Sequence, residues 1–132
     1  MVVAAMRSPA GASAAILRSI RGGHATLILS VPLAIEYEAV CQQGEHRLAA
    51  GLSKQQVDIF VTVMIATAEP VETHFLWRPQ LRDPGDEMVL EAAVNGRTEV
   101  LVTFNLRDYG ETPNRFGVEL LLPRIAIERI RR

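Results

Sequence analysis

Three carboxylates stand at the start of a predicted helix in the stretch RDPGDEMVLEAA, residues 82–93. Asp83, Asp86 and Glu87 surround a proline and a glycine, and apolar residues at helical spacing follow them. Two explanations are open. Asp83 can cap the helix, with Pro84 as its first residue, and acids in a first turn also suit the helix dipole. Alternatively, some of these acids hold a cation.

Helical phase distinguishes Asp86 from its neighbour Glu87. At about 100° per residue, the apolar stripe of this helix contains Val89, Leu90, Ala93 and Val94. Asp86 falls within that stripe, whereas Glu87 lies to its side. A carboxylate in an apolar stripe needs a partner, because burying a lone charge is costly. We therefore expect Asp86→Asn to weaken Mn²⁺ binding more than Glu87→Gln does.

The other candidate residues follow other predicted strands. Glu36 lies in the second turn of the helix after ATLILS, at the edge of its apolar stripe, and Glu38 points further toward solvent. Asn105 and Asp108 directly follow TEVLVTF. Each has a plain explanation, since Glu36 can pair with an arginine and NLRDYG can be a polar turn. Converging carboxylates repel one another unless a divalent cation lies between them, and oxygen ligands suit Mg²⁺ or Mn²⁺.

Apolar strands alternate with helices along the chain. The patterns predict strands at 25–30, 71–77, 98–104 and 118–123, with 105–110 as a polar loop and 45–53 as a loop or short helix. They predict helices at 12–21, 31–43, 54–69 and 84–95, and a last helix from Pro123 or Arg124. This alternation indicates an α/β fold with a parallel sheet covered by helices on both faces. Ligands of such sheets bind beyond the carboxyl ends of the strands, where the candidate residues lie.

Composition bounds the class of protein. The 132 residues fit a single domain, 1–132, whose core is aliphatic because 48% of residues are hydrophobic and only 5% aromatic. The net charge of -1 does not indicate a nucleic-acid binder, and the single lysine, Lys54, lies near a predicted helix cap.

Cys41 is the only cysteine, which excludes an internal disulfide and suits a reducing cytoplasm. His24, His46 and His74 lack a second ligand at metal spacing.

No membrane association is predicted. No apolar run in the chain reaches the roughly 18 residues of a membrane span. The opening residues contain an early arginine and a proline and do not have the order of a signal peptide.

Several stretches make the chain resemble the PIN-domain family, in particular the toxin components of VapC-like toxin–antitoxin systems. They are VVAAMRSPAGASAAILR, LSVPLAIEYEAV, RDPGDEMVLEAAVNGRTEVLVTFNLRDYG and GVELLLPRIAIERI, and they cover nearly the whole chain. The segment 82–110 is the most specific of them. The resemblance implies a PIN-like parallel sheet flanked by helices and a ribonuclease that depends on Mg²⁺ or Mn²⁺.

The resemblance also implies roles for individual residues. Glu36 matches the acid after the second strand of the family, and Asp86 matches the acid at the head of the later helix. Asn105 stands where many members carry Asp, Asp108 is the next acid along, and Thr103 matches a small hydroxyl residue before that loop. Glu36, Asp86 and Asp108 would then hold the metal, with Asn105 as a weak ligand or a residue that orients water.

One departure from the family concerns its first strand. Relatives begin with a central strand that ends in Asp-Thr-Asn, directly before a segment like VVAAMRSP, and its Asp is a metal ligand. This sequence starts at Met1, so we expect that strand to be truncated, through a start set downstream of the true one or through degradation of the copy. We accordingly expect residues 1–132 alone to have little or no ribonuclease activity.

The function expected from the resemblance is cleavage of single-stranded RNA by a toxin that a cognate antitoxin restrains and that can form a homodimer. The apolar residues of the helix at 54–69 cover more than one narrow stripe of its surface. They can be buried in the core of the domain or in a dimer interface. Three other interpretations stay open. They are an inactive binding protein with this fold, a receiver-like α/β domain, and a domain whose acids are only helix caps.

Overall fold

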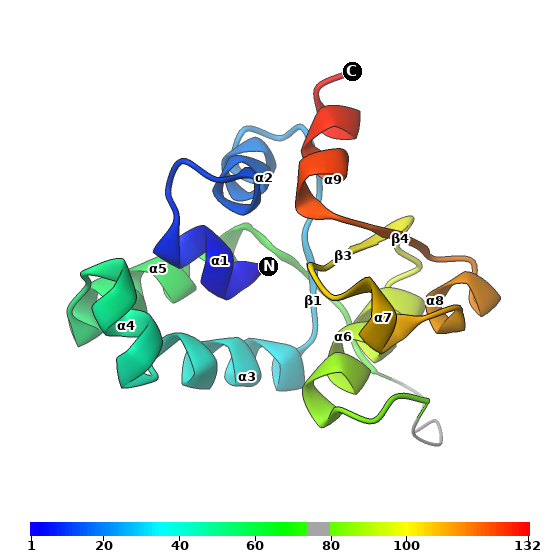
Figure 1. Ribbon diagram of the computed structural model, residues 1–132, viewed down its shortest axis with the longest axis horizontal. Helices are drawn as coiled ribbons and strands as arrows, with labels where there is room; N and C mark the ends of the chain where they lie inside the picture. The colour runs from blue at the N-terminus through cyan, green and yellow to red at the C-terminus, as the bar shows by residue number, and fades with distance from the viewer. Residues whose placement is uncertain (74–79) are drawn as a thin grey trace.

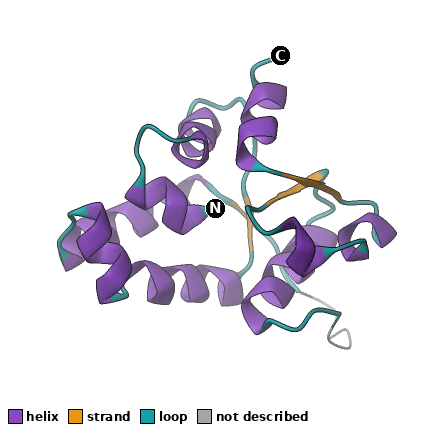
Figure 2. Cartoon of the chain, viewed as in Figure 1, coloured by secondary structure: helices purple, strands orange, loops and turns teal. Residues whose placement is uncertain are grey.

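The chain alternates helices with short strands, as Figures 1 and 2 show for a computed structural model that describes residues 1–73 and 80–132. Its elements in chain order are α1 (Val2–Arg7), α2 (Ala12–Arg21), β1 (Ile28–Leu29), α3 (Val31–Cys41), α4 (Gly44–Ala50), α5 (Lys54–Thr67), β2 (Glu69–Pro70), α6 (Pro84–Asn95), β3 (Val100–Val102), α7 (Leu106–Tyr109), α8 (Thr112–Arg115), β4 (Glu119–Leu121) and α9 (Pro123–Ile130). The α/β class is therefore confirmed.

Capping residues set the starts of the central helices where the sequence predicts them. The Ser30 hydroxyl caps α3 by accepting from the Leu33 amide at 3.2 Å. Ser53 and Gln56 form a capping box at the start of α5. Pro123 opens α9, as expected. These local interactions explain why helix positions follow closely from the sequence.

Two of the expected segments differ from the prediction. NLRDYG is not a plain loop, because residues 106–109 form α7, whose last residue, Tyr109, is buried in the core. The strand expected at 71–77 is shifted in the part that can be described: β2 lies at Glu69–Pro70, residues 71–73 are irregular, and residues 74–77 lie outside the described segments. The helices α1 and α8 were not expected from the sequence patterns.

The strands form two separate parallel pairs within the described residues, and the single sheet expected from the sequence is not seen. β1 pairs with β2, with Ile28 opposite Glu69, and β3 pairs with β4, with Leu101 opposite Leu120. Figure 1 shows β3 and β4 side by side, with α6, α7 and α8 below them in this view, and β1 near the centre of the molecule.

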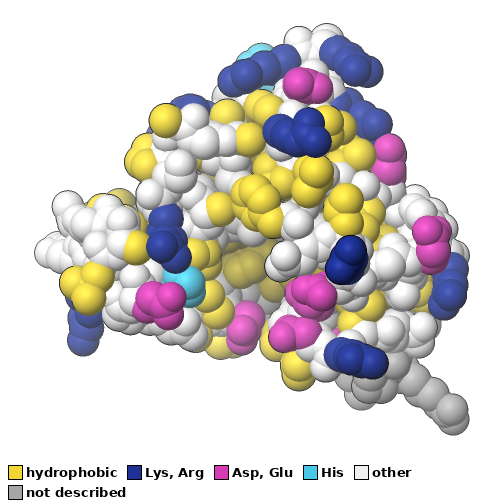
Figure 3. All heavy atoms as spheres, in the orientation of Figure 1, with side chains coloured by type: hydrophobic (Ala, Val, Ile, Leu, Met, Phe, Trp, Pro, Cys, Tyr) yellow, Lys and Arg dark blue, Asp and Glu magenta, His cyan; other side chains and the backbone are white. Residues whose placement is uncertain are grey.

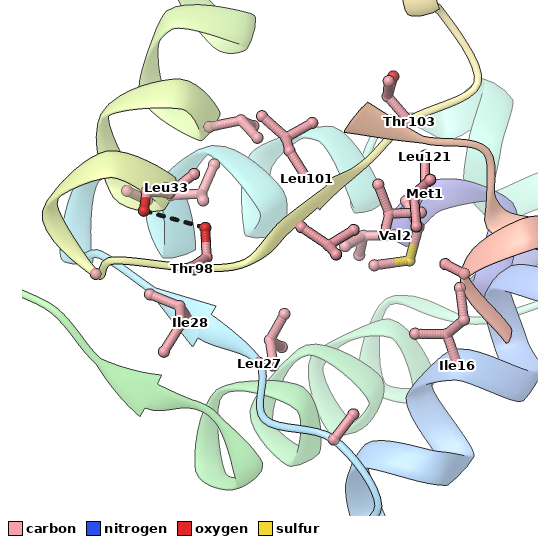
Figure 4. A pocket seen from close by; sticks show the side chains of 18 of the residues that line it. Met1, Val2, Ile16, Leu27, Ile28, Leu33, Thr98, Leu101, Thr103 and Leu121 are labelled. Carbon is pink, nitrogen blue, oxygen red and sulfur yellow. Dashed lines mark hydrogen bonds between the residues drawn. The ribbon is translucent and has the colours of Figure 1, made fainter. Parts of the chain in front are cut away.

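A cavity of about 760 Å³ lies between the two pairs. Figure 4 shows Leu27 and Ile28 of the β1 segment on one side of it and Leu101 of β3 on the other. Met1 and Val2, at the start of α1, also line it. Leu33 and other apolar side chains make up most of its remaining wall, and Figure 3 shows a hydrophobic recess in this face of the molecule.

Within the described residues, each of the two strands that border the cavity, β1 and β3, pairs along one edge only. The amides of Glu69 and Val71 donate to the carbonyls of Leu27 and Leu29, so the backbone groups of Ile28 between them point away from β2. By the same alternation, the backbone groups of Val100 and Val102 point away from β4. Within the described residues no strand bridges these two edges, so the pairs are not joined into the single sheet that the sequence predicts.

The core is divided among several clusters. The largest joins α1, α3 and α5 through the buried residues Val2, Met6, Cys41, Val57, Val61 and Met64. Cys41 is completely buried, and burial raises the pKa of its thiol to about 11. A second cluster beside β3 contains Ala93, Leu101, Tyr109 and Val118. Among the described residues, no helix is both long and apolar enough to cross a bilayer.

Candidate functional site

The predicted site residues come from three segments, and four of them line the cavity. Glu36 of α3, Asp86 of α6, and Thr103 and Asn105 after β3 all line it. Asp108, in α7, is exposed and does not line the cavity, although its charge acts on Asp86. Figure 3 shows acidic side chains beside the hydrophobic recess.

Asp83 is the N-cap of α6. Its Oδ1 atom accepts hydrogen bonds from the amides of Gly85 at 2.7 Å and Asp86 at 3.1 Å. A carboxylate in this position satisfies amides that the helix leaves unpaired and also suits the helix dipole. The capping explanation offered by the sequence therefore holds for Asp83.

Glu87 is the buried acid of the three, contrary to the expectation that it lies to the side of the apolar stripe. Its side chain is only 9% exposed, and its carboxylate accepts from the amide of Gln80 at 3.0 and 3.1 Å and from that of Leu81 at 2.9 Å. These bonds fasten the segment before α6 to the first turn of the helix. Glu87 is thus a structural residue, because its oxygens are occupied by backbone donors.

Asp86 alone of the three faces the cavity. The Tyr109 hydroxyl donates to Asp86 Oδ1 at 3.3 Å, and this is the hydrogen bond that the side chain of Asp86 makes within the described residues. Burial raises the pKa of Asp86, Asp83 raises it further, the Tyr109 bond lowers it, and Asp108 raises it slightly. Within the described residues, the partner of Asp86 is therefore a neutral hydroxyl and not a cation.

Glu36 lies beside the start of α6. A Cβ atom placed on Gly85 would lie 3.8 Å from Glu36 Oε1, which locates this carboxylate next to the turn that carries Asp86. Glu36 is half-buried, while Glu38 is exposed, as helical phase predicts. The ion pair with arginine considered for Glu36 is not found in the part of the chain that the structure describes.

The segment after β3 brings the remaining candidates. The Asn105 amide donates to Thr103 Oγ1 at 3.1 Å, which fixes the turn between β3 and α7. Asn105 is exposed at the mouth of the cavity. The left-handed backbone of Gly110, at φ 53°, then ends α7 directly after Tyr109.

The donor set suits a hard divalent cation in its chemistry, since it consists of carboxylate and amide oxygens. Asp83 and Asp108 both raise the pKa of Asp86, so negative charges act on one another here. However, no group of three or more His, Cys, Asp or Glu residues in the described segments is close enough to enclose a metal. In this part of the chain the acids are therefore not assembled into a closed ligand cluster.

Tyr109 is the residue of this site that sequence reasoning missed. It lies in NLRDYG, which reads as a polar turn, and its contact with Asp86 joins residues 23 positions apart. The one available signal was a tyrosine directly after Asp108, but an aromatic residue in a turn does not by itself indicate a site.

Comparison with known proteins gives one family match. Residues 1–107 match the family model described as PIN domain. No curated protein and no solved structure matches the chain significantly.

Proposed function

Because the chain belongs to the PIN-domain family, a family of nucleases, we propose that it is a metal-dependent endoribonuclease that cleaves single-stranded RNA. We further propose that it acts as the toxin of a VapC-like toxin–antitoxin pair. The observation that carries the proposal is the position of Asp86, which lines the same cavity as Glu36 and Asn105 and has a tyrosine hydroxyl, not a cation, as its side-chain partner within the described residues.

The proposed roles are those that the resemblance to the family implies for these positions. Glu36, Asp86 and Asp108 would hold Mg²⁺ or Mn²⁺, and Asn105 would ligate weakly or orient water. When bound, the metal lowers the pKa of a coordinated water and neutralises charge that develops on the phosphate. Asp86 supplies a fixed carboxylate from the first turn of α6, and the exposed Asn105 and Asp108 can approach RNA from the open side.

Cleavage of a fluorescent single-stranded RNA oligomer with and without Mn²⁺ tests the proposal. Because residues 1–132 alone are expected to cleave little RNA, the assay uses the chain extended before Met1 by about ten residues that end in Asp-Thr-Asn. In that extended chain we expect Asp86→Asn to reduce metal-dependent cleavage at least about 100-fold, because one charged ligand is lost. Glu38→Gln removes an acid of α3 that is exposed to solvent and serves as the control. Equal cleavage by the two variants would contradict the assignment of Asp86.

A second candidate function is that of a PIN-fold binding protein without catalytic activity. The observation that favours it is that the described acids do not enclose a metal site. RNA binding without cleavage, at saturating Mn²⁺ and with the chain cooperatively folded, would support this function over the first.

The proposed partners are RNA, a cognate antitoxin and a second copy of the chain. Val57, Val61 and Met64 of α5 are used by the core, but the same helix leaves Ile59 58% exposed. On α3, Ile35 is 62% exposed. These residues favour association through α3 and α5, and light scattering that finds a strict monomer at high concentration would argue against a homodimer.

A further inference from the structure

Tyr109 joins the hydrophobic core to the acidic end of the cavity. Its side chain is 4% exposed and packs in the cluster with Ala93, Leu101 and Val118. Its hydroxyl reaches Asp86 Oδ1 at 3.3 Å. A ring held by α6, β3 and the segment before β4 has little freedom, so its hydroxyl occupies a defined position next to the carboxylate.

The contact also links two separate segments. Asp86 lies in the first turn of α6, while Tyr109 is the last residue of α7. The other two acids of the α6 turn are occupied, since backbone amides bond to the side chains of Asp83 and Glu87. Asp86 has no such backbone donor, so the Tyr109 hydroxyl is what restrains its orientation within the described part of the chain.

We propose that Tyr109 is a positioning residue that orients Asp86 toward a bound divalent cation. The hydroxyl engages Oδ1 and leaves Oδ2 available to a metal. This role rests on the proposed metal site, and it deepens that proposal because it assigns a residue outside the matched segment 1–107. Hydrogen-bond partners of this kind fix the orientation of metal-binding carboxylates, and their loss typically weakens binding by about 10–100-fold.

Calorimetric titration with Mn²⁺ alone provides the main test. Tyr109→Phe keeps the buried ring and removes only the oxygen atom, and we expect it to weaken Mn²⁺ binding about tenfold. Tyr37→Phe is the matched control, because Tyr37 is the other tyrosine near this site and lines the same cavity, yet is not bonded to Asp86. In an Asp86→Asn background, Tyr109→Phe should cause no further loss, because Tyr109 acts through Asp86.

A second measurement leaves Tyr109 in place. The Tyr37→Phe protein contains Tyr109 as its sole tyrosine, so a change in tyrosine ultraviolet absorbance on addition of Mn²⁺ reports on that hydroxyl. We expect the tyrosine absorbance to change with Mn²⁺ concentration and to level off, with the same dissociation constant that calorimetry gives. If the absorbance does not change when the site is saturated with Mn²⁺, the proposal is contradicted, even if Tyr109→Phe fails to fold.

The outcomes separate this role from the proposed function. No Mn²⁺ binding by the unsubstituted chain would overturn the metal site and the role of Tyr109 together. Binding that Asp86→Asn abolishes but Tyr109→Phe leaves unchanged would overturn only the role of Tyr109. A tenfold loss that persists in the Asp86→Asn background would show a general structural effect and would also overturn it.

Discussion

At the scale of single residues, three adjacent acids have three different tasks. Asp83 caps α6, Glu87 holds the backbone of residues 80 and 81, and Asp86 faces the cavity. Asp86 and Glu87 are adjacent acids of the same charge. Their surroundings differ, because backbone amides donate to the carboxylate of Glu87 and a tyrosine hydroxyl donates to that of Asp86.

Glu87→Gln should therefore reduce stability. A glutamine side chain has one acceptor oxygen, so its amide nitrogen would face a backbone N–H group that now bonds to a carboxylate oxygen. We expect the free energy of unfolding to fall by about 1–3 kcal/mol, measured by urea denaturation. The exposed Glu38→Gln should change it little, and equal stability of the two variants would show that the contacts of Glu87 are not retained in solution.

At the scale of elements, the close approach of α6 to β1 depends on a glycine. A Cβ atom on Gly96, the C-cap of α6, would lie 2.5 Å from Ile28 Cγ2 and 3.0 Å from the carbonyl oxygen of Ala92. The backbone of Gly96 is in the ordinary right-handed region, so the requirement is purely steric. This contact brings the end of α6 against the strand on the far side of the cavity.

Gly96→Ala is expected to destabilise the fold by about 1–3 kcal/mol, because either Ile28 or α6 must shift. Thermal unfolding measures the effect. Gly44→Ala is the control, since a Cβ atom at that position in the first turn of α4 has no neighbour within 4 Å. If the Gly96→Ala protein is as stable as the Gly44→Ala protein, α6 and β1 do not approach closely enough at Gly96 to exclude a Cβ atom.

At the scale of the whole molecule, the cavity between the two strand pairs is the main unfilled feature. Strand edges that have no strand beside them within the described residues border it, and Met1 lies against it. Met1 is half-buried, and burial lowers the pKa of its amino group. Because Met1 lines the cavity, a strand added before it would start beside these edges.

An extension of about ten residues before Met1, ending in Asp-Thr-Asn, should raise stability and supply an additional acid at the proposed metal site. Each backbone group that gains a partner is worth on the order of 1 kcal/mol, so we expect the melting temperature to rise by about 5 °C or more. We also expect Mn²⁺-dependent cleavage of single-stranded RNA to increase. The control is a glycine–serine extension of equal length.

Two results would contradict parts of that prediction. Strong metal-dependent cleavage by residues 1–132 would show that the added acid is dispensable. An extended chain that folds cooperatively but does not cleave RNA would favour the binding protein over the nuclease.

The sequence by itself determined the features that depend on nearby residues. Ser30, Ser53 and Asp83 cap their helices because capping joins residues two or three positions apart. The alternation of strands and helices gave the α/β class, and the motifs from 82 to 110 led to the family that the comparison then found.

Tertiary structure decided what depends on contacts between distant segments. The division of the strands into two pairs, the burial of Glu87 and the bond from Tyr109 to Asp86 were not predictable from spacing. Helical phase placed Asp86 in the apolar stripe and Glu87 to its side, yet Glu87 is the buried carboxylate. Only the approach of residues 80, 81 and 109 separates the structural carboxylate from the one that faces the cavity.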